Sequence, residues 1–399
     1  MKRFGNLWSK FCSVENAVSA IEQGTENKRG DRDVIAAFAY SPEQIAAKPD
    51  LEHKIDHGKA AAYAKSLVSR IESGKWNPHK ARYEKKWCKP GKWRDIYCPA
   101  LEDHIVHWML ILVLHPAFMR GMYAHSCGSV PKRGCKHLIK YVSRWVQNDS
   151  ESKYFVKLDI HHFFPSITKE RLKASFRLLI KDERLLVFID MLIDASPCAA
   201  PIGFYTSPWF SNYFLQPFDH FVMQALFKTR RGKRIPYVRH YMRYADDMLL
   251  LGSSKRDLEK AVRAIIAELR DNYGLTIKPT WEIKRVGYHV QSEDGNRWKL
   301  AKGTCYVDYG GYKFARDCVI LRDRNFFSCK RSAKKIYKRK IINDGIRLHD
   351  AQGMVSKIGM TKHCNSRNFI NKYINPYVKQ KELREVISNA AKCGVFKQT

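Results

Sequence analysis

Apolar residues recur at helical spacing over much of this chain. They stand three or four positions apart at 34–48, 60–74, 103–117, 136–147 and 168–180. This spacing puts them on one face of a helix, so it predicts helices in all five segments. A Gly, Ser and Pro turn at 203–208 leads into a further long apolar helix, and the pattern is helical and basic again from about 325.

The segment 254–274 gives the clearest helix. Ser254 and Asp257 predict a capping box at its start, and Gly274 predicts its end. Its apolar residues share one face: Leu258, Val262, Ile265 and Leu269. We therefore expect that face to be buried.

Other segments predict strands. Residues 76–100 are basic, aromatic and broken by Gly and Pro, which predicts a β-hairpin with Lys89 to Lys92 at its turn. A strand is predicted at 153–159, and residues 233–252 predict two short strands that meet at a tight turn, Ala245 to Asp247. Strands separated by loops follow at 287–322. The order of helices and strands predicts an α+β fold with a sheet backed by helices.

The chain is strongly basic. Its 399 residues include 72 Lys and Arg against 39 Asp and Glu, which gives a net charge of +33. Because so large a charge repels itself in a compact protein, it favours a polyanionic partner. A basic chain that is merely soluble, or attracted to a membrane surface, is the alternative. The 12% of aromatic residues favours nucleic acid instead.

Cysteine usage and hydropathy predict a cytoplasmic protein. The eleven cysteines include no CxxC pair, which favours reduced thiols over a disulfide or zinc framework. The first twenty residues lack the apolar region of a signal peptide. The longest apolar stretch, 105–119, is shorter than the roughly 18 residues that a membrane span needs. We therefore expect no membrane partner and interpret this stretch as a buried helix.

Two adjacent carboxylates stand inside the apolar stretch 241–251. Asp246 and Asp247 repel each other, and burying either is costly without a compensating charge. A divalent cation would supply that charge, because Mg²⁺ prefers hard oxygen ligands. Asp159, 87 residues before Asp246, is the third candidate, and only a fold that pairs the two strands brings it to the same place. An exposed Asp-Asp turn is the alternative, which the apolar residues 248–251 disfavour.

Ordered sequence blocks give the chain a resemblance to the reverse transcriptases, especially the bacterial retron, group II intron, diversity-generating and defence-associated types. The blocks are KPGKWRDIYCPALEDHIVHWML, SCGSVPKRGCKHLI, FVKLDIHHFFPSI, APIGFYTSPWFSN, RYADDMLL, GLTIKPTWEIKRV and CYVDYGGYKFARDCVILR. The resemblance runs from about residue 5 to about 380 and implies a right-hand polymerase. It implies a helical extension (1–75), fingers (76–150), a palm with an antiparallel sheet backed by helices and with finger elements interleaved (151–315), and a helical thumb with the C-terminal helices (316–399).

The resemblance also implies a two-metal active site. By it Asp159, Asp246 and Asp247 are catalytic and bind two Mg²⁺ ions, for which Mn²⁺ can substitute. Asp159 is implied to contact both ions and the backbone carbonyl of Ile160 one of them, while Asp247 contacts metal less directly. One ion activates the primer 3′-hydroxyl, and the other holds the triphosphate.

The same resemblance implies which residues contact the incoming dNTP. Lys92 and Arg94, on the basic hairpin, are implied to meet its phosphates. Phe164 is implied to exclude a 2′-hydroxyl, and one of Phe163 and Phe164 is expected to belong to the core. His104 stands where the family usually carries Arg.

A second set of nucleotide contacts is implied further along the chain. Ile202 and Gly203 are implied to cover the nascent base pair, with Gly203 allowing close backbone approach. Many members carry Gln at the position of Ile202, so low copying fidelity is a hypothesis. Lys278 is implied near the leaving phosphates, with Lys284 as the alternative because the registration is ambiguous.

Template and primer contacts are implied for a further set of residues. They are Lys132, Arg133 and His137 on the template, Ser207, Gly310 and Gly311 near the nascent pair and primer, and the thumb residues Lys334, Lys335, Lys338, Arg339 and Lys340 along the duplex. An ordinary solvated loop or helix face is the alternative for these cations.

The resemblance therefore implies an RNA-directed DNA polymerase, a nucleotidyltransferase that copies a non-coding RNA into DNA from dNTPs. A bacterial antiviral defence or retroelement system is the implied setting. Template-independent or protein-primed synthesis is one alternative, and a catalytically inactive nucleic-acid-binding scaffold is another. All three carboxylates are present, which disfavours the scaffold. An accessory protein or a homo-oligomer is left open.

Overall fold

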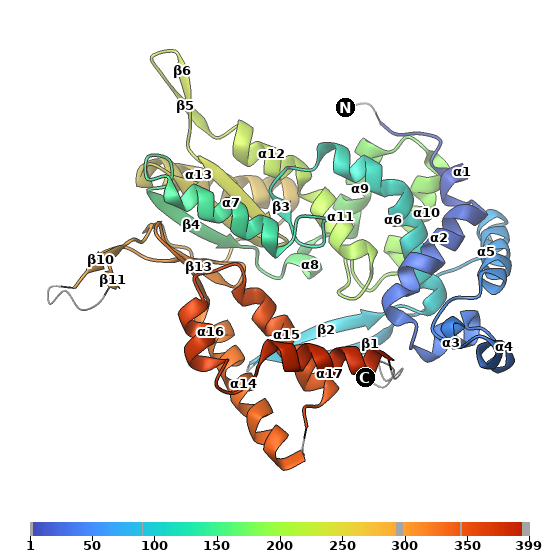
Figure 1. Cartoon of the computed structure of the whole chain (residues 1–399). Helices are drawn as coiled ribbons and strands as arrows, with labels where there is room; N and C mark the ends of the chain where they lie inside the picture. Colours follow the sequence, from blue (N-terminus) through green and yellow to red (C-terminus); the bar gives the residue numbers. More distant parts are fainter. Residues whose placement is uncertain (1–2, 90, 293–297, 344, 393–399) are drawn as a thin grey trace. The chain divides into compact units, whose positions relative to one another are not determined.

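The computed structural model of this chain describes residues 3–89, 91–292, 298–343 and 345–392 (Figure 1). The chain forms two compact units, each assembled from three stretches of sequence. Unit 1 comprises residues 1–130, 159–221 and 265–278, and unit 2 comprises residues 131–158, 222–264 and 279–399. Among the helices described, none combines the length and the apolar character needed to cross a membrane.

Unit 1 is mainly helical. Its elements before residue 130 are α1 (Trp8–Phe11), α2 (Val14–Thr25), η1 (Glu26–Lys28), α3 (Arg32–Phe38), α4 (Pro42–Ala47), η2 (Pro49–Leu51), α5 (His57–Glu72), β1 (Arg82–Lys89), β2 (Lys92–Cys98), α6 (Leu101–Gly121) and β3 (Ser126–Cys127). After Asp159 come α8 (Phe163–Ser166), α9 (Lys169–Leu179), α10 (Glu183–Ala195) and α11 (Thr206–Phe214). The apolar helix α6 is central, because both α2 and α11 pack against it. This confirms the interpretation of 105–119 as a buried helix.

Glu102, in the first turn of α6, ties that helix to α5. Its carboxylate accepts hydrogen bonds from Arg70 Nη1 (3.0 Å), Tyr63 OH (3.0 Å) and Trp76 Nε1 (2.9 Å). Burial alone would raise the pKa of Glu102, but these bonds, led by that of Arg70, hold it below its ordinary value. The carboxylate is therefore charged at neutral pH and holds three side chains in place.

The basic hairpin forms where it was predicted. Strands β1 and β2 are antiparallel, and Lys89 pairs with Lys92 across the turn. Because side chains alternate between the faces of a strand, the exposed pair Trp87 and Trp93 shares one face, and Arg94 lies on the other.

Unit 2 contains the sheet that carries the acidic turn. Its strands β4 (Tyr154–Asp159), β7 (His240–Tyr244), β8 (Asp247–Gly252) and β9 (Lys284–Arg285) follow the order β7-β8-β4-β9. Asp159, the last residue of β4, begins the second stretch of unit 1. The remaining strands are β5 (Phe227–Arg230), β6 (Lys233–Pro236), β10 (His289–Gln291), β11 (Trp298–Leu300), β12 (Val307–Tyr309), β13 (Tyr312–Phe314) and β14 (Val319–Leu321). Helix α7 (Cys135–Gln147) packs against β13.

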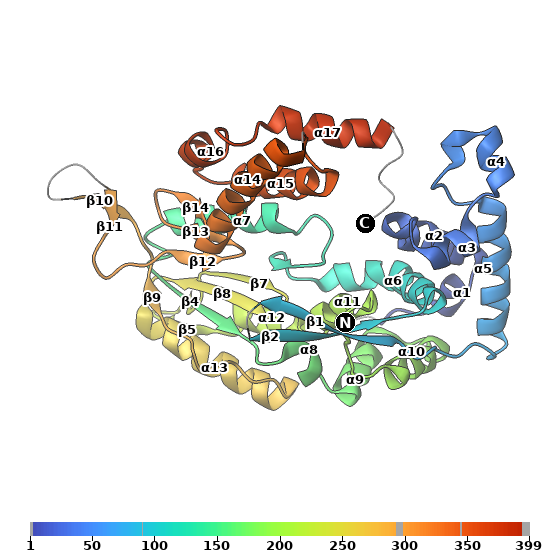
Figure 2. The same ribbon diagram turned by 90° about the horizontal axis from the view of Figure 1, so that it is seen from below.

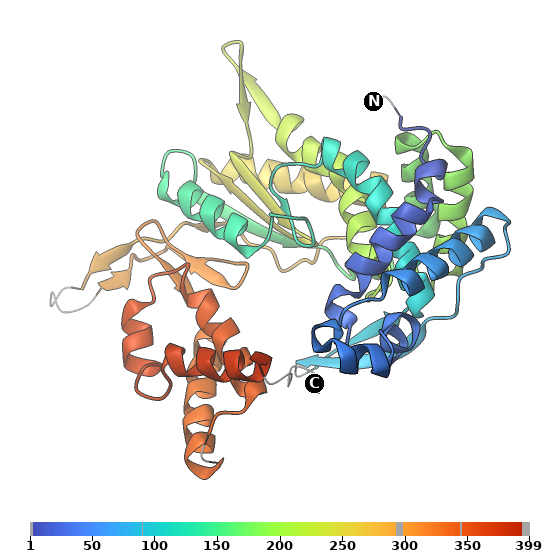
Figure 3. The ribbon, with the colours of Figure 1, turned by 45° about the vertical axis from the view of Figure 1, so that its right-hand side comes forward.

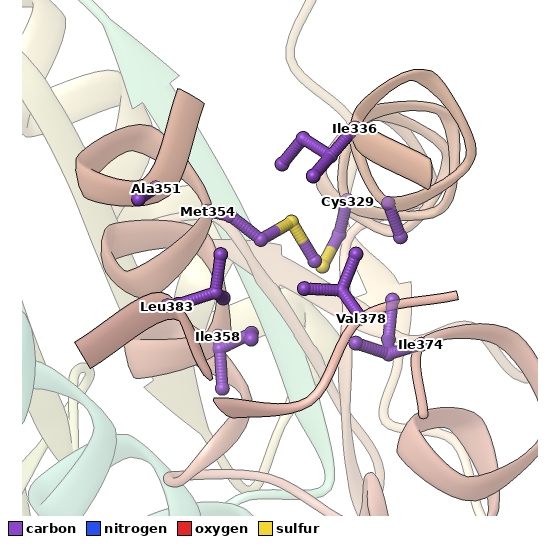
Figure 4. Close-up of a cluster of buried hydrophobic side chains, with 9 residues drawn as sticks. Cys329, Ile336, Ala351, Met354, Ile358, Ile374, Val378 and Leu383 are labelled. Carbon is purple, nitrogen blue, oxygen red and sulfur yellow. The ribbon is translucent and has the colours of Figure 1, made fainter. Parts of the chain in front are cut away.

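Four helices end the described chain: α14 (Asp323–Asn343), α15 (Leu348–Thr361), α16 (Arg367–Tyr373) and α17 (Gln380–Lys392). Helix α15 packs against both α14 and α17 (Figure 2). They share a small core that includes Cys329, Met354 and Leu383, all at most 1% exposed (Figure 4). The helical pattern predicted from about 325 is confirmed.

Helix α13 (Lys255–Tyr273) confirms the clearest prediction, because its four predicted apolar residues are all fully buried. Its cap differs in one respect. Ser254 Oγ accepts a hydrogen bond from the Asp257 N–H (3.3 Å), but the Asp257 carboxylate accepts from Lys228 (2.6 Å) and does not complete the predicted capping box. Gly274 ends the helix with a φ of +67°.

Four elements differ from the prediction. The helix predicted at 34–48 is two helices, α3 and α4, because Ser41 caps the second one and Pro42 stands at its start. Helix α10 and the hairpin formed by β5 and β6 have no counterpart in the prediction. The single long apolar helix predicted after the Gly, Ser and Pro turn is two helices, α11 and α12 (Gln216–Gln224). The break falls at Leu215, which is fully buried.

Candidate active site

The two adjacent carboxylates lie at a two-residue hairpin turn. Tyr244 pairs with Asp247, so only Ala245 and Asp246 form the loop between β7 and β8. Ala245 has a φ of +55°, as the first loop position of a two-residue hairpin requires. An alanine in this left-handed region costs roughly 1–2 kcal/mol, which glycine would avoid. The carboxylates are therefore displayed on a strained turn.

Two buried side chains hold this turn from within unit 2. The fully buried Arg243 donates from Nη1 to the Ala245 carbonyl (3.0 Å). The equally buried Tyr309 donates its hydroxyl to the Asp247 carbonyl (2.8 Å). The sequence analysis missed both residues. A cation inside an apolar strand was the available signal for Arg243, whereas nothing local marks Tyr309.

Asp159 ends β4, and its partner is Lys278. The Lys278 N–H donates to the Asp159 carbonyl (2.9 Å), and the Lys278 ammonium forms an ion pair with Oδ1 of Asp159. That oxygen is buried and receives no hydrogen bond of acceptable geometry. Lys284, the alternative to Lys278, forms an ion pair with Glu282 (3.1 Å).

The donor chemistry here suits a divalent cation. The three aspartates offer only carboxylate oxygens, which are hard ligands of the kind that Mg²⁺ prefers. Oδ1 of Asp159 is buried and faces a cation, the Lys278 ammonium, which shows that this carboxylate is placed to hold positive charge. The buried Ile160 directly follows β4 and forms an isolated antiparallel bridge with Ile277. The backbone therefore stays in the extended conformation just beyond the end of β4.

A second potential ligand group lies elsewhere in unit 2. Ligand atoms of His289, Asp317 and Cys318 lie within 4.8 Å of one another. The imidazole of His289 already bonds Asp317 (2.7 Å) and the hydroxyl of Tyr306 (2.7 Å). This group is therefore satisfied by its own hydrogen bonds, and its thiol suits a softer metal than Mg²⁺.

The two phenylalanines after β4 have different surroundings. Phe163 is 3% exposed and belongs to the core, whereas Phe164 is half-buried with its ring 5.2 Å from that of Phe163. Phe164 is thus the accessible ring of the two, as its predicted contact with a nucleotide sugar requires.

Gly203 lies against the end of the basic hairpin. Its φ is +116°, and a Cβ added there would lie 2.2 Å from the Tyr97 carbonyl oxygen. The neighbouring Ile202 carbonyl accepts a hydrogen bond from the Tyr97 N–H (2.8 Å). Ser207 is 2% exposed and donates to the Pro201 carbonyl (2.6 Å), so its hydroxyl closes this loop and does not face solvent.

The predicted phosphate-binding cations differ in exposure. Lys92 and Arg94 are exposed on β2. In the loop before α7, Lys132 is exposed and adopts a φ of +62°, and Arg133 and His137 are half-buried. Burial, helped by the nearby charges of Arg133 and Lys140, lowers the pKa of His137. The imidazole of His137 is therefore neutral at neutral pH, which makes it a weaker partner for a phosphate than a charged imidazole would be. His104 is buried and hydrogen-bonds the Gly24 carbonyl (3.1 Å).

Gly310 and Gly311 form the tight hairpin predicted for them. They are the two loop residues between β12 and β13, with φ of +57° and +92°. A Cβ on Gly310 would lie 2.6 Å from Leu138 of α7, so the hairpin packs closely on that helix.

Some of the cations on helix α14 form contacts with neighbouring helices. Lys334, Lys335 and Lys338 are exposed. Arg339 donates to Asp350 of α15 (2.7 Å), and Lys340 forms an ion pair with Glu382 of α17. The contacts of Arg339 and Lys340 thus hold the helices together, whereas Lys334 lies over the Tyr377 ring at 5.6 Å and Lys335 and Lys338 are exposed.

Comparison with known proteins supplies an independent finding. Residues 79–280 match the family described as reverse transcriptase (RNA-dependent DNA polymerase). The chain is 25% identical over 230 residues to Protein YkfC of Escherichia coli strain K12, covering 49% of this chain and 60% of that protein. It is 28% identical over 211 residues to the Retron Ec73 reverse transcriptase of Escherichia coli, covering 49% of this chain and 62% of that protein. The chain thus spans less than two thirds of the length of these relatives.

A solved structure is also similar. The telomerase of Candida albicans in complex with a fragment of telomeric RNA aligns with a TM-score of 0.44 and 11% identity. The alignment covers 84% of this chain and 64% of that one.

Proposed function

The chain belongs to the reverse transcriptase family, and from this premise we propose that it is an RNA-directed DNA polymerase that adds dNTPs to a primer 3′-hydroxyl. The observation that carries the proposal is the span of the family match. It covers residues 79–280 and so includes Asp159, Asp246 and Asp247. A scaffold that had lost the chemistry would not be expected to keep all three carboxylates.

The three aspartates are proposed to hold two Mg²⁺ ions, with Mn²⁺ as a substitute and the Ile160 carbonyl as a further ligand. The ion pair of Asp159 Oδ1 with Lys278 supports this assignment, because it shows the carboxylate holding a cation, as does the adjacency of β4 and β8 in the sheet order. When bound, such ions lower the pKa of the attacking hydroxyl and neutralise the departing pyrophosphate. Lys278 neutralises Asp159 in their absence and is proposed to turn toward the triphosphate when metal binds.

The other residues are proposed to position the substrates. Lys92 and Arg94 bind the triphosphate, and Phe164 lies against the sugar and excludes a 2′-hydroxyl. Gly203 and the Ile202 backbone cover the nascent base pair, in a loop that Ser207 holds closed. These roles follow the family pattern, and the exposure of Lys92 and Arg94 is consistent with it.

Template and product are proposed to bind the remaining cations and the glycine hairpin. The residues are Lys132, Arg133 and His137 for the template, Gly310 and Gly311 for the primer, and Lys334, Lys335 and Lys338 for the duplex. The retron reverse transcriptase among the relatives supports a retroelement setting, and we extend this proposal to a non-coding RNA template and to a bacterial defence system as the alternative setting. A cytoplasmic location is part of this proposal.

Sequencing of co-purified nucleic acids tests the proposal. Wild type and an Asp246→Ala/Asp247→Ala variant would be purified from cells that carry the native locus, and their RNA and DNA sequenced. We expect both to bind the same RNA and only the wild type to carry complementary DNA. DNA absent from both, or equal in both, would favour a binding scaffold. DNA without a complementary RNA would point to untemplated synthesis, and a nucleotide covalently bound to the protein to protein priming.

A further inference from the structure

A basic hairpin in unit 2 has no role in the proposed reaction. It is formed by β5 and β6, and residues 227–236 contain Lys228, Arg230, Arg231, Lys233 and Arg234 but no acidic residue. The hairpin extends away from the β7–β8 strands as a narrow two-stranded arm (Figures 1 and 3).

Four of these five cations are available to a partner. Arg230, Arg231, Lys233 and Arg234 are exposed, and none of them forms an ion pair within the part of the chain that the structure describes. Lys228 differs, because it donates to Asp257 of α13 (2.6 Å) and anchors the base of the arm. Four cations therefore crowd the tip, where their mutual repulsion favours an anionic partner.

The register distributes this charge over both faces of the arm. Arg230 pairs with Lys233, and Thr229 pairs with Arg234. Because successive side chains alternate between faces, Arg230 and Lys233 lie on one face and Arg234 on the other. Arg231 and Gly232 form the two-residue turn, with φ of +50° and +75°. The arm thus carries cations on each face and at its end.

This distribution fits a groove better than a flat surface. An anionic membrane would meet the cations of one face only, and the tip carries no apolar side chain to enter it. Single-stranded nucleic acid is bound mainly by exposed aromatic rings, and the one ring of the arm, Phe227, is covered by the Arg234 guanidinium at 4.5 Å. The wide, shallow minor groove of A-form RNA has a phosphate backbone on each side, so a narrow ribbon lying across it can present cations to both backbones.

We propose that the β5–β6 arm binds the phosphate backbones of double-stranded RNA across a groove. The arm would grip a base-paired stem by shape and charge without reading its sequence. Assigning that stem to the template RNA rests on the proposed function, whereas duplex binding itself does not. The arm is therefore a second anchoring surface for RNA, separate from the carboxylates.

The test removes the four exposed charges and measures duplex binding. The variant Arg230→Gln/Arg231→Gln/Lys233→Gln/Arg234→Gln would be compared with wild type and with Lys10→Gln/Lys48→Gln/Lys65→Gln/Lys75→Gln. The control loses the same net charge at exposed lysines in the N-terminal helical region. The probe is a blunt RNA duplex of roughly 20 base pairs, longer than the ~16 that a compact duplex-binding domain covers. Single-stranded RNA of the same sequence and phosphatidylserine vesicles are the other two probes, and thermal unfolding checks folding.

We expect the arm variant to bind the duplex about tenfold or more weakly at physiological salt, with a salt-dependence slope smaller by about 3. The control variant should retain most of the wild-type slope. Equal losses in both variants would overturn the proposal, because general charge would then explain binding. A loss confined to single-stranded RNA or to vesicles would also overturn it. These measurements need no dNTP, so a failure of primer extension in the wild type would refute the proposed function and leave this result standing.

Discussion

Replacing Gly203 with alanine puts a methyl group where unit 1 has no room for it. The added Cβ would lie 2.2 Å from the Tyr97 carbonyl oxygen and 3.1 Å from its carbonyl carbon. Both are backbone atoms, so no side-chain rotation relieves the contact. The Tyr97 N–H also donates to the Ile202 carbonyl (2.8 Å), which fixes the two segments against each other. The variant must therefore move the loop away from β2.

Two costs set the size of the effect. A non-glycine residue at a φ of +116° is strained by about 1–3 kcal/mol. Withdrawal of the loop then breaks the bond between Tyr97 and Ile202, at a net cost of about 1 kcal/mol. Together they lower the free energy of local opening by roughly 2–4 kcal/mol. This corresponds to roughly 30- to 900-fold faster exchange of the Tyr97 amide.

Hydrogen exchange measured on peptides covering 96–98 and 201–207 reports this opening directly. Two other glycines separate the causes. Gly74 has a φ of +69° but nothing within 4 Å of an added Cβ, so Gly74→Ala tests backbone strain alone. Gly30 has neither a positive φ nor a close neighbour, so Gly30→Ala tests the substitution itself. If Gly203→Ala speeds local exchange no more than Gly74→Ala does at its own site, close approach to Tyr97 is not what requires glycine, and the reasoning fails.

Two further predictions concern hydrogen bonds. Tyr309→Phe removes the hydroxyl that supports the carbonyl at the start of β8, so we expect slower nucleotide addition with unchanged RNA binding. The control Tyr312→Phe loses a hydrogen bond to a carbonyl of α15 and should leave the rate of nucleotide addition unchanged. If both variants lose rate equally, support of the acidic turn by Tyr309 does not explain the effect. Glu102→Gln should destabilise the α5–α6 contact by about 1–3 kcal/mol at neutral pH. Because the folded-state pKa of Glu102 is depressed below its ordinary value of 4.5, this difference should be full above 4.5. It should be lost progressively as pH falls from 4.5 through the lower folded-state pKa, which hydrogen exchange of residues 57–76 can show.

Features with local signals could be predicted from the sequence. The face of α13 follows from four apolar residues at helical spacing, all of them buried. The hairpin of β1 and β2 follows from turn residues between basic, aromatic strands, and its turn lies at Lys89 to Lys92 as predicted. The tight turn at Ala245 to Asp247 follows from two acidic residues between apolar strands. In each case the residues that cause the structure lie within a few positions of it.

Features that depend on distant residues could not be predicted. Tyr309 supports the carbonyl of Asp247 although 62 residues separate them. Arg339 belongs to a run of cations, and only the packing of α14 on α15 brings Asp350 to it. The periodicity of a sequence describes one helix or strand at a time. It therefore cannot show which charged side chains form ion pairs with a neighbouring element.

The acidic turn shows how apolar residues can set the position of polar ones. All four residues from Met248 to Leu251 are fully buried, as are Tyr241 and Met242 on the partner strand. Because β8 is buried on both faces, a one-residue slip would not expose it; the close packing of these side chains, the two-residue loop and the bond from the buried Arg243 to the Ala245 carbonyl fix the register instead. With the register fixed, Tyr244 must pair with Asp247, and Ala245 must accept its positive φ. The strain at Ala245 is thus maintained by core residues, and a change in the core of β7 or β8 would move the carboxylates.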